Sequence, residues 1–413
     1  MFKQQALLNL NKEARQGLMT AMALWFLMNA GFFLVIPLLS VHYVDELGWA
    51  AAFIGVVLAV RQFMQQGLTV FGGALADRFG AKGLIVLGIV IRSASFVMMG
   101  FATTPPMLLL SGVLAALGGA LFDSPMKAVV AALAPEEMLS DLYANVGILQ
   151  NVARTVGPII GALLINIDFS VVGLAAAGFF LVAFFVAYFG LAEVAISTDK
   201  QTVTAGLTIA FKDRAFVTYT VLMMGFWFMW VQMSIAFPLE AKALTNSNSS
   251  VGVLFTVNAV IAIVLQVPAL KLAQKFLQPL PMLILGVLFM AFGLVTVAWV
   301  DRMMQLYLSV FFFALGSVLV TPNAQTVAAK MCNPAARGAY FGVNSLALAC
   351  GGGIGQVAGG TMVDLAAAWN LPALPWIVSA MVGTAAAIGL ARFYRQQRLG
   401  VRPRALLTAG SGD

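Results

Sequence analysis

The sequence predicts an all-α polytopic membrane protein with twelve transmembrane helices, arranged as two pseudo-symmetric six-helix bundles. Its 413 residues are 61% hydrophobic and only 9% charged, whereas a soluble domain carries roughly 25% charged residues. Apolar runs long enough to cross a bilayer, about 20 residues each, recur along the whole chain. The second half of the chain also repeats features of the first half in the same order.

Each predicted span is an apolar run bounded by glycine, proline or charged residues. The twelve spans are expected at residues 17–43, 49–76, 83–102, 106–132, 140–167, 170–191, 216–241, 250–274, 280–299, 303–331, 338–364 and 373–394. Several exceed the length that a bilayer requires, so we expect them to tilt or to extend beyond it. Proline bends a membrane helix, and we expect Pro37 and Pro238 to form gating bends in the first and seventh spans.

One long polar break divides the chain into two halves of six spans. The expected parts are an N-terminal bundle at 1–191, a cytoplasmic linker at 192–215, a C-terminal bundle at 216–396 and a cytoplasmic tail at 397–413. The end of the linker, from Lys212 to Arg214, is expected to lie on the membrane surface as a short helix.

The two halves match each other at a nearly constant offset. The stretch 75–79 (LADRF) aligns with 272–276 (LAQKF), and Pro125 aligns with Pro322. A parallel repeat of six spans places a binding site between the halves, near the middle of the bilayer.

Basic residues are concentrated in the connections that we expect to face inward. The inner connections hold Arg78, Lys82, Lys200, Lys212, Arg214, Lys271, Lys275 and Arg337, whereas the outer ones hold Lys242 and Arg302. By the positive-inside rule, both termini are cytoplasmic. This distribution also accounts for the net charge of +7, so no nucleic-acid partner is expected.

The chain offers little for metal or covalent chemistry. Its two cysteines, Cys332 and Cys350, form no CxxC pair, and His42 is its single histidine. No metal site or bound cofactor is therefore expected. The sequence contains no nucleotide-binding G-x-x-x-x-G-K-[ST] stretch, paired acids, Ser–His set or HExxH. A membrane enzyme or a non-transporting receptor is the alternative from another class of protein, and these absences argue against the enzyme.

The turn between the second and third spans carries a specific pattern, GGALADRFGAK. Gly73, Asp77, Arg78, Gly80 and Lys82 in this stretch resemble, position by position, the loop signature of the major facilitator superfamily. The resemblance implies the major facilitator fold and alternating access. It also implies that these residues form a conformational latch.

Asp123 lies inside the fourth span, and two roles are open to it. The resemblance implies that it is the latch partner of Arg78, whereas its spacing from Lys127 permits a local structural pair. The latch charges themselves have a plainer alternative, which is that they only orient the loop.

The fifth span contains VGPIIGALL. With Arg154, its residues Gly157, Pro158 and Gly161 resemble the antiporter motif of the drug:proton antiporter group of the same superfamily. The resemblance implies a bacterial inner-membrane protein, expected to be a monomer, that exports small amphipathic compounds by antiport against a proton gradient. The resemblance also implies multidrug efflux and antibiotic resistance.

Polar residues inside the spans are the candidates for a substrate cavity, because their burial in a membrane is costly. Arg61 and Gln65 share one face of the second span, Asn258 is the counterpart of Arg61 in the repeat, and Asn29 lies in the first span. Arg61 could hold an anionic group or the counter-charge of a proton site. The structural alternative is a hydrogen-bonding hub between helices.

The seventh span is rich in methionine and aromatic residues, which suit varied ligands. Trp227, Trp230 and Gln232 are the cavity candidates here. For any single residue of this span, contact with lipid is the plainer alternative.

The spans contain few acids that could carry a proton. A member of the antiporter group has an acid near the centre of the first span, whereas this chain has only uncharged residues there, including Asn29. The remaining candidates are Asp123 and, near the outer face, Asp45, Glu46, Glu240 and Asp364. Proton coupling is thus implied by the resemblance. The alternative function is a transporter of an anionic metabolite or lipid-like molecule that is not proton-coupled.

Overall fold

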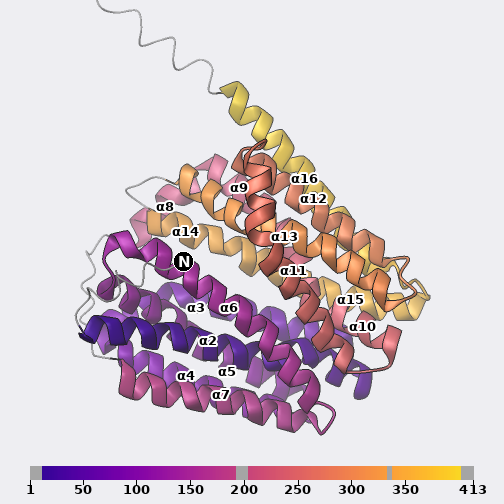
Figure 1. The fold of residues 1–413 in the computed structure, drawn as a ribbon, viewed down its shortest axis with the longest axis horizontal. Helices are drawn as coiled ribbons and strands as arrows, with labels where there is room; N and C mark the ends of the chain where they lie inside the picture. Colours follow the sequence, from indigo (N-terminus) through magenta and orange to yellow (C-terminus); the bar gives the residue numbers. More distant parts are fainter. Residues whose placement is uncertain (1–11, 192–202, 333–336, 401–413) are drawn as a thin grey trace, which may run out of the picture. The chain divides into compact units, whose positions relative to one another are not determined.

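The computed structural model describes residues 12–191, 203–332 and 337–400. Within these ranges, the side chains at 69–79, 128, 131, 136–141, 143–144, 203–207, 337–338 and 397–400 lie outside the description. All regular elements of the described residues are helical (Figure 1).

Helices of the first half account for the first six predicted spans. They are α2 (Lys12–Ser40) with the π-helical turn η1 (Val41–Glu46), α3 (Ala51–Phe79), α4 (Ala81–Gly100), α5 (Pro105–Leu133), α6 (Glu136–Leu164) and α7 (Phe169–Gly190).

The second half begins with a short helix and continues with the remaining spans. Its elements are α8 (Val203–Lys212), α9 (Arg214–Trp230), the 3-10 turn η2 (Val231–Ser234), α10 (Ala236–Thr245), α11 (Ser249–Gln274), α12 (Pro279–Val297), α13 (Met303–Met331), α14 (Arg337–Leu346), the π-helical turn η4 (Ala347–Gly352), α15 (Gly353–Trp369) and α16 (Leu374–Gly400).

Twelve helical stretches among the described residues are long and apolar enough to cross a membrane. The predicted number of spans is therefore confirmed, and the helix bounds differ from the predicted ones by a few residues. The short helix expected from Lys212 to Arg214 is wrong, because α8 ends at Lys212, Asp213 is extended and α9 begins at Arg214. Asp213 instead caps α9 by accepting a hydrogen bond from the Phe216 N–H at 3.1 Å.

The turn between α3 and α4 is tight, because a single residue separates the two helices. Gly80 occupies that position with φ of 79°, a conformation that glycine adopts without the steric cost paid by other residues. The glycine of the predicted signature therefore has a local backbone role.

The seventh span is interrupted rather than bent at Pro238. The α-helix ends at Trp230, passes through η2 and resumes as α10, with Pro238 in its first turn. Proline has no N–H to donate to the carbonyl four residues earlier. That carbonyl, on Ser234, instead accepts a hydrogen bond from the Ser40 hydroxyl at 3.4 Å.

The eleventh span also departs from regular α-helix, in the turn η4. Two glycines at and just after this turn allow close approach to α9: a Cβ on Gly351 would clash with the Met224 backbone, and one on Gly355 would lie 2.8 Å from the Phe228 Cα. π-helical turns are frequent at functional sites.

The chain forms two compact units. The first contains residues 1–200, 232–259 and 356–370, and the second contains 201–231, 260–355 and 371–413. In the first unit, parts of α10, α11 and α15 therefore pack with the first six spans. Within it, α4 lies beside α5 and α7, and α2 beside α6 and α7 (Figure 1).

Each unit contains the same close glycine contact between two neighbouring helices. In the first unit, a Cβ on Gly88 of α4 would lie 2.7 Å from the Gly118 carbonyl of α5. In the second, a Cβ on Gly286 of α12 would lie 2.7 Å from the Gly316 carbonyl of α13. The internal repeat is therefore present in the packing as well as in the sequence.

Candidate functional site

A buried polar group, here called the arginine cluster, lies inside the first unit and consists of Arg61, Gln62, Gln65, Arg92 and Asp123. Arg61 of α3 is 6% exposed. Its Nη1 donates to Gln65 Oε1 at 2.8 Å and its Nη2 to Gln62 Oε1 at 3.2 Å. The prediction that Arg61 and Gln65 share one helix face is thus confirmed.

The arginine cluster reaches α5 through Gln65. Its Nε2 donates to Asp123 Oδ2 at 2.9 Å. No ion pair within 4 Å joins Asp123 to Lys127 among the described residues. Asp123 instead interacts electrostatically with both Arg61 and Arg92.

Aromatic rings cover one side of the two guanidinium groups. The Cζ atoms of Arg61 and Arg92 lie 4.8 and 5.1 Å from the ring centroid of Phe32 on α2. Arg92 also lies 5.6 Å from the centroid of Phe180 on α7. Cation–π attraction of this kind strengthens when the cation is removed from water.

Glycine on α5 makes room for the arginine cluster. A Cβ on Gly119 would lie 2.8 Å from Gln65 Nε2 and 3.1 Å from Arg92 Nη1. A side chain at this position would therefore displace one of the two groups.

Arg92 is left with unused hydrogen-bonding capacity. It is 6% exposed, and its guanidinium has no hydrogen-bond acceptor among the described residues. The Nε atoms of both Arg61 and Arg92 are buried without a partner in this part of the chain. Burial of an unpaired polar or charged group is costly, so two arginines facing one carboxylate suit a site that receives a further anion.

The other predicted cavity residues lie in both units. In the first unit, Asn29 Nδ2 donates to the Trp25 carbonyl at 2.8 Å, within α2. Gln232 is 1% exposed and lies against Gly359. The Oδ1 atom of Asn258 is buried without a partner among the described residues.

Trp227 and Trp230 belong to α9 in the second unit. Their ring centroids are 5.5 Å apart in an edge-to-face arrangement, which is a favoured geometry for aromatic pairs. The structure thus places Arg61, Gln65, Asn29, Gln232 and Asn258 in one unit and the two tryptophans in the other. Sequence reasoning left Arg92 and Phe32 out of the cavity, although a charge inside the third span was a usable signal.

The predicted antiporter motif packs α6 closely against α2. A Cβ on Gly157 would lie 2.8 Å from the Ala30 carbonyl, and one on Gly161 would clash with the Leu34 carbonyl. Arg154 places its Cζ 5.3 Å from the ring centroid of Phe33. Gly252 of α11 also packs against the motif, because a Cβ on Gly252 would lie 3.3 Å from the Pro158 carbonyl.

Most of the predicted latch lies outside the described side chains. This is the case for Gly73, Asp77 and Arg78, whose backbone belongs to α3. Lys82 at the start of α4 places its Nζ 5.7 Å from the ring centroid of Tyr188 on α7. The latch therefore stays a prediction.

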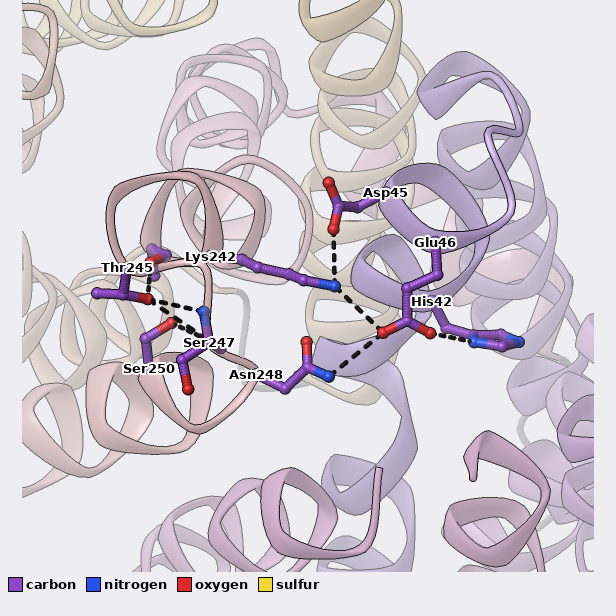
Figure 2. A network of polar contacts seen from close by, with 9 residues as sticks. His42, Asp45, Glu46, Lys242, Thr245, Ser247, Asn248 and Ser250 are labelled. Atoms are coloured by element: carbon purple, nitrogen blue, oxygen red, sulfur yellow. Dashed lines mark hydrogen bonds and ion pairs between the residues drawn. The ribbon is translucent and has the colours of Figure 1, made fainter. Parts of the chain in front are cut away.

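A second polar group, the outer network, lies at the ends of the spans that we expect to face outward (Figure 2). Lys242 Nζ contacts Asp45 Oδ2 at 2.7 Å and Glu46 Oε1 at 3.1 Å. Glu46 Oε2 lies 2.8 Å from His42 Nδ1, and Glu46 Oε1 accepts from Asn248 Nδ2 at 3.3 Å. These five residues join the end of the first span to α10 and to the start of α11.

Asp364 of α15 makes a second connection on this side. Its two carboxylate oxygens accept hydrogen bonds from the N–H groups of Ala51 and Ala52, at 2.8 and 2.7 Å. It thereby caps the first turn of α3, whose N–H groups have no partner within their own helix. The sequence predicted Asp45, Glu46 and Asp364 only as proton carriers and missed these contacts.

The sequence pattern of the Major Facilitator Superfamily matches residues 21–242 and again 233–409. The chain is 34% identical to the multidrug resistance protein MdtH of Yersinia enterocolitica over 369 residues, which are 89% of this chain and 92% of that protein. MdtH of Shigella flexneri matches with the same identity and the same coverage.

Solved structures show the same fold. A mutant of the nucleoside transporter NupG matches with a TM-score of 0.80 and 12% identity over 91% of this chain and 99% of its own. The peptide transporter POT in complex with sulfate matches with a TM-score of 0.78 and 14% identity over 96% and 98% of the two chains. At these identities the likeness concerns the fold alone.

Proposed function

Since the chain belongs to the major facilitator superfamily and is therefore a secondary transporter rather than an enzyme, we propose that it exports small amphipathic compounds as a multidrug efflux protein. The observation that carries the proposal is the 34% identity to a multidrug resistance protein across 89% of the chain. The proposed setting is a bacterial inner membrane, with both termini cytoplasmic, and the proposed state is a monomer.

The proposed mechanism is alternating access between two helical bundles. In the first unit, the arginine cluster and Phe32 offer charged and aromatic contacts to a substrate that has both polar and apolar parts. The interruptions at η2 and η4 give the seventh and eleventh spans points at which to change shape. Asp77, Arg78 and Asp123 are proposed to stabilise one of the two states.

The test of efflux is accumulation of fluorescent amphipathic dyes and antibiotics in bacterial cells that lack their main exporters. Cells that produce the protein should accumulate less of several compounds than cells with an empty vector. Addition of a protonophore should abolish the difference if export is proton antiport. Equal accumulation for every compound would contradict the proposed function.

A second candidate function is favoured by the burial of Arg61, which is 6% exposed. In this reading the substrate is an anionic metabolite or a lipid-like molecule, and transport is not coupled to protons. Transport in vesicles distinguishes the two readings, because uncoupled movement would follow only the substrate gradient and the membrane potential.

A further inference from the structure

The arginine cluster carries an excess of positive charge that helix packing does not require. The internal repeat provides the comparison. Gly118 of α5 faces Arg92 of α4, with a Cβ position 2.9 Å from the Arg92 Cβ. Gly316 of α13 faces Met290 of α12 in the same way, with a Cβ position 2.6 Å from the Met290 Cγ. Met290 is fully buried, so an apolar side chain fills the equivalent place in the second unit.

The charges of the cluster are unequal in number. Among the described side chains, two guanidinium groups, on Arg61 and Arg92, face one carboxylate, that of Asp123. Hydrogen bonds from Gln65 and to Gln62 satisfy only part of this group, and the Nε atoms of both arginines remain unpaired among the described residues. One additional negative charge would balance the cluster and accept the unused N–H donors.

We infer that Arg61 and Arg92 form a subsite for the anionic group of an amphipathic substrate, and that Phe32 receives the aromatic part of the same molecule. The ligand class is an aromatic compound that carries a carboxylate or a sulfonate. This assignment rests on the proposed function and names the substrate class for it.

The chemistry of the subsite supports this ligand class. A guanidinium group presents a planar fork of donors that matches the two oxygens of a carboxylate. Phe32, Gln65 and Asp123 are each only half-buried, so the two buried guanidinium groups lie next to side chains that the protein does not fully enclose. Aromatic rings stack favourably on one another and on guanidinium planes.

An anionic substrate also bears on how export is driven. A membrane potential that is negative inside the cell favours the exit of an anion. Export of this ligand class therefore needs no proton-carrying acid at the centre of the first span, where the chain has Asn29.

The test compares three probes with the same aromatic body: naphthaleneacetate, naphthaleneacetamide and naphthylmethylamine. Calorimetric titration of the purified full-length protein gives a dissociation constant for each. We expect the anion to bind about tenfold more tightly than the neutral amide. Arg61→Gln and Arg92→Gln should each remove this preference, whereas Arg392→Gln, the same change at an exposed position of α16, should preserve it.

Arg92→Lys is a second variant that keeps the charge and changes only the donor geometry. Arg92→Lys should show a reduced but measurable preference for the anion over the amide. It serves as the test of the subsite if Arg92→Gln does not purify as a single species. The assignment is overturned if the wild-type protein binds the amide or the amine as tightly as the anion, or if the Arg92 variants keep the full preference.

Failure of this inference can be distinguished from failure of the proposed efflux function. If cells export cationic dyes but the purified protein shows no preference for the anion, the efflux function is supported and the anion subsite is contradicted. If the purified protein clearly prefers the anion but does not lower the accumulation of any compound in cells, the anion subsite is supported and the efflux function is contradicted.

Discussion

Gly119 shows how a single residue determines the arrangement of the arginine cluster. It lies on α5 at the point where Gln65 of α3 and Arg92 of α4 approach the helix. Gln65 accepts a hydrogen bond from Arg61 and donates one to Asp123 at this point. The absence of a Cβ at this position is therefore what allows an amide and a guanidinium group to share the same space.

Gly119→Ala should destabilise the protein by about 1 kcal/mol, the low end for overpacking a buried site, because the new Cβ would meet the flexible ends of Gln65 and Arg92. It should also weaken binding of naphthaleneacetate, since Arg92 would move. The measurements are thermal unfolding in detergent and calorimetric titration.

Gly147→Ala on α6 is the matched control, because a Cβ there would meet nothing within 4 Å. This control should leave binding unchanged and, as an alanine in a helix, should not lower stability. Equal melting temperatures for both variants would show that Gly119 has no such spatial role.

At the scale of elements, the outer network joins segments that are far apart in the chain. Lys242 of α10 is the single cation that contacts Asp45 and Glu46 of η1 in the described part of the protein. Its side chain is 14% exposed, whereas those of the two acids are 50% and 33% exposed. Partial exposure makes each pair weak, so this contact can hold the outer ends together and still release them.

Lys242→Ala should open this side of the protein more often, because it removes both ion pairs that join α10 to η1. In a variant lacking Cys332 and Cys350, Ser40→Cys serves as the reporter, since Ser40 is fully buried and contacts Ser234. Its labelling by a membrane-impermeant maleimide should become about two- to fivefold faster, which corresponds to less than 1 kcal/mol.

Lys271→Ala is the control for the outer network, since Lys271 is exposed on another part of α11. It removes the same charge and should leave the labelling rate of the reporter unchanged. A labelling rate that is the same with Lys242→Ala would mean that the network does not hold these ends together.

At the scale of the whole molecule, the proposed proton antiport requires an acid that can bind and release a proton. Asp123 is the one acid that the structure places in the arginine cluster, where it accepts a hydrogen bond from Gln65. The acids of the outer network and Asp364 already hold Lys242, His42 and the start of α3. Among Asp123, Asp45, Glu46 and Asp364, Asp123 is therefore the best-placed proton carrier for the proposed antiport.

Asp123→Asn should uncouple transport from the pH gradient while preserving exchange of substrate between the two sides. The amide oxygen can still accept from Gln65, but the side chain can no longer bind or release a proton. Proteoliposomes with an imposed pH gradient measure the first property, and counterflow of labelled substrate measures the second. If transport by Asp123→Asn depends on the pH gradient as strongly as transport by the wild-type protein, another residue carries the proton.

The sequence by itself determined the twelve spans, the turn at Gly80 and the family. These features depend on local properties: the length of an apolar run, the conformational freedom of one glycine and a short pattern of charges between two spans. It also placed Arg61 beside Gln65, because residues four apart share a helix face.

Only the tertiary structure decided which polar side chains meet across helices. Arg92 and Phe32 join Arg61, and Lys242 joins Glu46, through contacts between residues that are widely separated in the chain. The interruption of the seventh span at Val231–Ser234, ahead of Pro238, was likewise visible only in the structure. The physical reason is that helix periodicity orients a side chain on its own helix, whereas its partners depend on how neighbouring helices pack.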